Sequence, residues 1–158
     1  MPRFLCDEML RGLGRWLRAA GYDTIFAEGA LPDRALAKRC AEEDRVLLTK
    51  DRHLAATVDS STPVLLVTGD GIDEAARTLR TALGIDWQHA PFTRCIVDNR
   101  LLDEAPPDLT TRVPERSRAA GGPLRVCPDC GRLYWPGSHV RRMQQRLVAW
   151  QTERSCAS

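Results

Sequence analysis

The sequence predicts an α/β fold in which a parallel sheet is covered by helices on both faces. Short apolar runs alternate with amphipathic helical patterns through the first 90 of the 158 residues, as expected for repeated β-then-α units. The runs are almost continuously apolar, which is typical of strands buried on both faces. Gly21 and Gly84 each follow a helical pattern, where a glycine in the left-handed conformation ends a helix.

Four strands are expected in this first part, at residues 4–6, 24–27, 46–48 and 64–67. Between and after them, apolar residues recur at helical spacing over 10–20, 36–41 and 72–83, and a shorter helix is expected around 54–58. Asp33 precedes the second of these helices and is a candidate for its N-cap. Cys6 and Cys40 lie inside apolar patterns and are expected in the core.

The pattern changes from about residue 91, so two units are expected, one over 1–90 and one over 91–158. Residues 95–102 resemble a hairpin, and residues 105–123 are rich in proline, glycine and charge and indicate a loop. A closing helix is expected at the end, with Val140, Met143, Leu147 and Trp150 on one stripe. Cys156 falls in an expected frayed tail.

Charge and hydropathy limit the classes of function. The net charge is +2, but residues 1–90 carry −2 and residues 91–158 carry +4. The positive charge of the second part could contact a polyanion, or it could simply belong to a solvated surface. No apolar run approaches the ~20 residues that span a bilayer, and no secretory signal pattern opens the chain. The expected location is the cytoplasm, without a membrane partner.

Acidic residues follow the predicted strands. Asp7, Asp51 and Asp70 each come shortly after an apolar run, and Asp33 follows the second run. Because sites in parallel sheets lie beyond the carboxyl ends of the strands, these carboxylates are expected at one edge, where hard oxygen ligands suit Mg²⁺ or Mn²⁺. The alternative is structural: Asp33 and Asp51 cap helices, and Asp70 sits in a turn.

Several short motifs, in this order, resemble the C-terminal ribonuclease domain of the Mut-seven proteins. That family combines a PIN-like nuclease domain with a zinc ribbon, and the resemblance covers nearly the whole chain. The motifs are FLCDEML (4–10), RWLR (15–18), GYDT (21–24), LLTKD (47–51), CPDCG (127–131) and YWPGSH (134–139).

The resemblance implies metal-dependent hydrolysis of single-stranded RNA. Catalytic metal ligands are implied at Asp7, Asp33 and Asp51, with Asp70 as a fourth acid and Glu8 as a helper. Water would be the nucleophile, so no side-chain nucleophile is needed. Four basic residues are expected near the acidic edge, either holding RNA phosphates or balancing nearby acids: Arg11, Arg15, Lys50 and Arg52.

A second metal site is expected in the later part. Cys127 and Cys130 have the spacing that lets two thiolates share one zinc ion. The resemblance implies a second Cys-x-x-Cys pair, but the chain has Cys95 followed by Asp98, so Asp98 takes the place of a thiol. Three outcomes stay open: Asp98 completes the site, His139 or water replaces it, or zinc is absent.

Two rival functions remain at this stage. One is a nucleic-acid-binding or protein-interaction module that has lost efficient catalysis, and the other is a phosphatase that uses the same acidic edge. The aromatic residues Trp87, Phe92, Tyr134 and Trp135 offer stacking faces for unpaired bases, but packing in a small core is the favoured interpretation.

Overall fold

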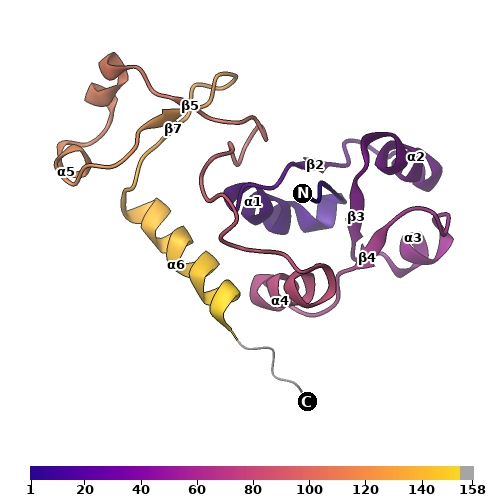
Figure 1. Cartoon of the computed structure of the whole chain (residues 1–158). Coiled ribbons are helices and arrows are strands. Elements are labelled where there is room, and N and C mark those ends of the chain that lie inside the picture. The colour runs from indigo at the N-terminus through magenta and orange to yellow at the C-terminus, as the bar shows by residue number, and fades with distance from the viewer. Residues whose placement is uncertain (154–158) are drawn as a thin grey trace.

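A computed structural model describes residues 1–153 and contains a parallel sheet of four strands (Figure 1). The strand order is β2-β1-β3-β4, and Leu5 pairs with Ile25 on one side and with Leu47 on the other. The predicted mixed α/β class and its parallel central sheet are therefore confirmed. The strand bounds are β1 (Phe4–Cys6), β2 (Thr24–Phe26), β3 (Val46–Thr49) and β4 (Val64–Leu66).

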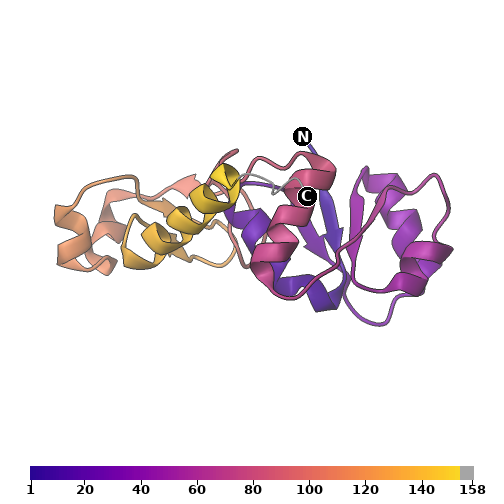
Figure 2. The ribbon, with the colours of Figure 1, turned by 90° about the horizontal axis from the view of Figure 1, so that it is seen from below.

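Helices cover both faces of this sheet, which forms the middle of three layers (Figure 2). Alternate residues of a strand point to opposite faces, so Phe4 and Cys6 join one buried cluster and Leu5 joins the other. Helices α1 (Arg11–Ala19) and α4 (Ile72–Leu83) supply the first cluster, and α2 (Asp33–Glu43) and α3 (Arg52–Thr57) supply the second. Cys6 and Cys40 are buried, as predicted.

Glycines end α1 and α4 where the sequence places them. Gly84 is the C-cap of α4 at φ 65°. Gly21 has φ 102°, and a Cβ atom there would lie 2.6 Å from the carbonyl oxygen of Ala90, so this close approach also requires glycine. The end of α2 carries no such signal, because Asp44 takes the left-handed conformation instead.

The later part contains a small antiparallel sheet, β5-β6-β7, formed by β5 (Asp103–Glu104), β6 (Arg125–Val126) and β7 (Leu133–Tyr134). The prediction of a loop over 105–123 was wrong in part, since η2 (Pro107–Arg112) and α5 (Glu115–Ala119) lie there. Pro107 opens η2 and Pro114 is the N-cap residue of α5. Prolines are tolerated at helix starts, where no backbone donor is lost.

The closing helix, α6 (Ser138–Thr152), packs against the first part of the chain. Trp150 is 1 % exposed and makes edge contacts with Trp16 and Trp87 at ring centroid distances of 4.8 and 5.0 Å. The division at residue 90 stays a prediction, and this helix shares the core of the first part. None of the helices within residues 1–153 has the length and apolar character needed to cross a bilayer.

Residues 95–99 dock the later part onto the edge strand β2. The side-chain oxygen of Asn99 accepts a hydrogen bond from the Thr24 amide at 2.9 Å. The buried Arg18 donates to the carbonyl oxygens of Thr24, Ile96 and Val97 at 2.8 to 3.1 Å. These bonds satisfy backbone groups at the edge of the sheet and fix the position of residues 95–99.

Candidate metal centres

The predicted acids lie at the carboxyl edge of the parallel sheet. The strand order β2-β1-β3-β4 means that the chain leaves β1 toward β2 on one side and continues through β3 and β4 on the other. Ligands in open α/β sheets bind at such a reversal point. Asp7 directly follows β1, and Asp51 follows β3 by two residues, so both lie at this reversal point.

Thr49, the last residue of β3, connects these two acids. Its hydroxyl donates to Oδ2 of Asp7 at 2.5 Å and accepts from the amide of Asp51 at 2.9 Å. Thr49 is fully buried. Sequence reasoning missed this residue, although a threonine that ends an apolar strand two positions before an acid is a usable signal.

Asp7 and Asp51 also hold helix starts. Oδ1 of Asp7 accepts from the amide of Met9 at 2.9 Å, at the start of η1 (Glu8–Leu10). Oδ1 of Asp51 accepts from the amides of His53 and Leu54 at 2.8 and 3.1 Å, so the capping interpretation is confirmed for Asp51. Within residues 1–153, no group donates a hydrogen bond to Oδ2 of Asp51, and Asp51 is exposed.

Asp33 and Asp70 are exposed and make few contacts. The expectation that Asp33 caps α2 is wrong, because Pro32 is the N-cap residue and Asp33 is already the first helical residue. Its Oδ2 lies 3.5 Å from the hydroxyl of Thr57 on α3. Asp70 sits in a turn, and its amide donates to Glu74 at 2.9 Å.

The acids are not gathered into one tight cluster. Among the described residues, three or more metal-ligating side chains come within 4.8 Å of one another only around Cys95. Asp7, Asp33 and Asp51 do not form such a group. Carboxylates repel one another without a cation, and Asp7 and Asp51 are held by local donors instead. A shared ion for Asp7, Asp33 and Asp51 therefore stays a prediction.

The four predicted phosphate contacts occupy different places. Arg11 opens α1, 5.1 Å from the centroid of the Phe26 ring, and the exposed Arg15 follows one turn later. Arg52 is the exposed first residue of α3. Lys50 is half-buried, and its Nζ lies 3.4 Å from the carbonyl oxygen of Gly69. Arg11 and Arg52 thus open helices, and Lys50 lies between the end of β3 and the start of α3.

Cys95, Asp98, Cys127 and Cys130 form the second candidate centre, with all ligand atoms within 4.8 Å of one another. The sulfur atoms of Cys95 and Cys130 are 3.9 Å apart, and Oδ2 of Asp98 lies 3.4 Å from the Cys127 sulfur. Zinc–sulfur bonds of about 2.3 Å in a tetrahedron separate two sulfur atoms by about 3.8 Å. The geometry therefore fits a metal ion such as zinc, with Asp98 as the fourth ligand.

The two halves of this centre have the same backbone. In each, the amide of the first cysteine bonds five residues ahead, Cys95 to Arg100 at 2.7 Å and Cys127 to Arg132 at 2.9 Å. The residue four positions after the first cysteine has a left-handed backbone in both halves, Asn99 at φ 67° and Gly131 at φ 74°. Asp98 therefore stands where a cysteine would stand. His139 lines a cavity next to β7 and is not among the clustered ligands.

Electrostatics at the thiols favour a bound cation. Burial raises the pKa of the Cys95 thiol, but hydrogen bonds from Tyr134 and the Asp98 and Val97 amides outweigh it and bring the pKa below its usual value. The Asp98 carboxylate raises the pKa of Cys130 to about 12. Three thiolates and a carboxylate repel one another unless a cation is present. The Tyr134 hydroxyl, 3.2 Å from the Cys95 sulfur, is a supporting contact that sequence reasoning missed.

Comparison with known proteins gives one family. The sequence model described as the Mut7-C RNAse domain matches residues 2–147. No curated protein and no solved structure gave a match.

Proposed function

The chain belongs to the Mut7-C RNAse domain family, and from this premise we propose that it is a Mg²⁺- or Mn²⁺-dependent ribonuclease with a PIN-like fold that cleaves single-stranded RNA. One observation carries the proposal: Asp7 and Asp51 follow the neighbouring strands β1 and β3 at the carboxyl edge of the sheet and are joined through Thr49. Asp33 and Asp70 would complete the acidic site from the same edge. RNA is the proposed partner.

The chain's own residues would orient the substrate. Asp7 and Asp51 would hold the ion through carboxylate oxygens, with water filling other positions, as Mg²⁺ sites in proteins usually do. Such an ion, when bound, activates water and stabilises the leaving oxygen. Arg11 and Arg52 begin helices and Lys50 follows β3 at this edge, where their cationic groups would bind RNA phosphates and offset negative charge that builds up on the phosphoryl oxygens.

The cysteine centre would act as a structural zinc site. It holds the 95–99 segment, which docks onto β2 through Asn99 and Arg18, so the ion would fix the ribbon against the nuclease part. A structural role agrees with four protein ligands, since catalytic zinc sites keep one position open.

Cleavage of a labelled, unstructured RNA with Mn²⁺ tests the nuclease proposal. Wild-type protein should cut it, chelation of Mn²⁺ should stop the reaction, and Asp7→Asn should lower the rate at least 100-fold. A small phosphomonoester should not release phosphate. RNA binding without cleavage would favour the non-catalytic module, and phosphate release from the monoester would favour a phosphatase.

A further inference from the structure

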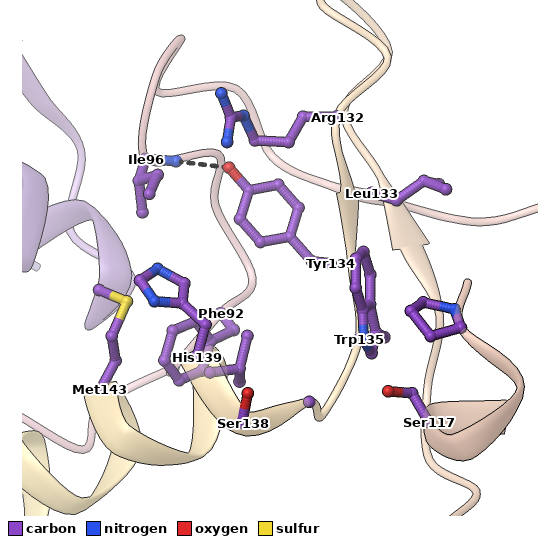
Figure 3. A pocket seen from close by; sticks show the side chains of 13 residues that line it. Phe92, Ile96, Ser117, Arg132, Leu133, Tyr134, Trp135, Ser138, His139 and Met143 are labelled. Carbon is purple, nitrogen blue, oxygen red and sulfur yellow. Dashed lines mark hydrogen bonds between the residues drawn. The ribbon is translucent and has the colours of Figure 1, made fainter. Parts of the chain in front are cut away.

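A cavity of about 290 Å³ lies beside the ribbon, between β7, α5 and the start of α6 (Figure 3). This volume is at the small end of the ~300–1,000 Å³ range of ligand pockets. The cavity therefore suits one small group, of the size of a nucleobase, and is too small for a large cofactor. No ligand of either candidate metal centre lines the cavity. Two neighbours of Cys95 do line it: Ile96, the next residue, and Tyr134, whose hydroxyl contacts the Cys95 sulfur.

Its walls are aromatic and held in place. Phe92 and Tyr134 are each 8 % exposed, and the Tyr134 hydroxyl is fixed by the Ile96 amide at 3.1 Å, as Figure 3 shows. Trp135 is half-buried and lies close to Gly137, where a Cβ atom would come within 2.7 Å of the indole nitrogen. Thus the core residues Phe92 and Tyr134 pack as expected, and Trp135 keeps an accessible face.

Polar groups surround this aromatic wall. Arg132, Ser138 and His139 line the cavity and are exposed, and Ser117 lines it from α5 (Figure 3). Imidazole and hydroxyl groups can donate to and accept from the edges of a nucleobase, and a guanidinium group can bind a phosphate. The cavity thus combines an aromatic wall with polar side chains that suit a nucleotide.

The segment that surrounds the cavity carries a surplus of basic residues. Residues 105–146 contain eight arginines and three acidic residues, and of these arginines Arg132 lines the cavity while Arg146 pairs with Asp73 at 3.2 Å. A second hollow of about 250 Å³ shares Trp135 and is lined by Arg125 and Arg141. Such a surplus of arginine beside aromatic faces is complementary to the phosphates and bases of a single strand.

We propose that the cavity binds one unpaired nucleobase of the RNA substrate, stacked on Trp135, while Arg132 and Arg141 bind the adjacent phosphates. The proposal rests on the proposed function and adds a second contact to RNA away from the acidic edge. It gives a physical reason for single-strand preference, because a base inside a duplex cannot leave its stack without an energetic cost. The ribbon then selects the strand state, and the acidic edge performs the chemistry.

Binding measured without cleavage tests this proposal. The full-length Asp7→Asn protein is titrated into a fluorescein-labelled 12-nucleotide RNA and into the same strand with abasic ribose units, and anisotropy is recorded. Trp135→Leu should weaken binding of the normal RNA about 10-fold, as loss of one base–aromatic stack predicts, and the abasic strand should bind equally weakly to both proteins. Arg132→Gln, at an exposed position, should weaken binding and reduce its salt dependence.

Arg77→Gln is the control for charge, since Arg77 is exposed on α4 and lies outside the cavity; it should bind like the parent protein. Equal binding of the normal and abasic strands, or unchanged binding by Trp135→Leu and Arg132→Gln, would overturn the proposal. The proposal would also be overturned if the protein bound no RNA, or if a peptide and not RNA occupied this cavity. Cleavage is scored separately in the wild-type background, so a failed base contact and a failed nuclease give different results.

Discussion

The buried hydroxyl of Thr49 donates a hydrogen bond to Asp7 across the β1–β3 pair. The same oxygen accepts from the Asp51 amide, so one side chain fixes both acids of the proposed active site. Groups that hold a catalytic constellation through packing and hydrogen bonds determine how closely it matches the reactive geometry.

Thr49→Val should lower RNA cleavage about 10- to 100-fold, because valine keeps the shape of the side chain but removes the hydroxyl that links Asp7 to the Asp51 amide. It should also lower the free energy of unfolding by about 1–3 kcal/mol, since the Asp7 carboxylate loses a buried donor. Single-turnover cleavage and urea unfolding measure the two effects. Thr62→Val, at another buried threonine, is the matched control, and equal activity of the two variants would contradict the role of Thr49.

Asp98→Cys should tighten zinc binding at least tenfold, because it supplies a fourth thiolate at a position whose backbone already matches that of Cys130. Asp98→Ala should weaken binding. Competition with a chromophoric chelator measures both affinities. Asp129→Ala, which changes an exposed acid outside the cluster, should leave the affinity unchanged. The role of Asp98 as a ligand fails if its two variants bind zinc like the wild type.

Asn99→Gly should lower the free energy of unfolding by about 1–2 kcal/mol. Glycine keeps the left-handed backbone but removes the bonds to the Thr24 amide and to Asp23. Asn99→Ala should cost about 1 kcal/mol more, because alanine is strained at φ 67°. Urea denaturation of the zinc-loaded proteins gives this order, and alanine being better tolerated than glycine would contradict it.

Acid should remove the stabilisation that comes from Asp23. Burial raises its pKa, but hydrogen bonds from Arg45 and Asn99 outweigh burial and lower the pKa to about 2 from the usual 3.8. Since the folded pKa lies below the unfolded one, the contribution is complete above about pH 4 and is lost as the pH falls toward 2. At most about 2 kcal/mol is involved, and the side chain is 23 % exposed.

Wild-type and Asp23→Asn proteins should therefore differ most in thermal stability above about pH 4 and converge as the pH falls to about 2 and below. Both carry the same thiol cluster, so metal loss in acid affects both alike. A difference that persists unchanged at pH 2 would show that the ionised carboxylate is not the cause.

The sequence was most informative where a local pattern decides the structure. Apolar runs predicted the four strands, the acids behind them were expected at one edge, and the Cys127–Cys130 spacing predicted a metal site. These features depend on periodicity and on ligand spacing, which are local properties. That Cys95 and Asp98 complete the cluster was implied by the family resemblance.

Long-range contacts could not be read in the same way. Arg18 looks like an exposed helical arginine, but it is buried with carbonyl partners more than 70 residues away. Helix α6 packs into the core of the first part through Trp150. Which element covers the apolar face of a helix depends on the whole fold, so the sequence of α6 alone does not identify it. The short helices at 107–119 were missed because proline and glycine content dominates the local signal there.

Binding of Mn²⁺ to the acidic edge tests the central claim most directly, with free Mn²⁺ followed by electron paramagnetic resonance in zinc-loaded protein. Asp7→Asn and Asp51→Asn keep acceptors for the helix caps, since asparagine caps as well as aspartate, and they remove one charge each. Asp108→Asn, an exposed acid on η2, is the control. We expect the wild type and the control to bind Mn²⁺ and the Asp7 and Asp51 variants to lose this binding; equal binding by all four proteins would contradict the proposed site.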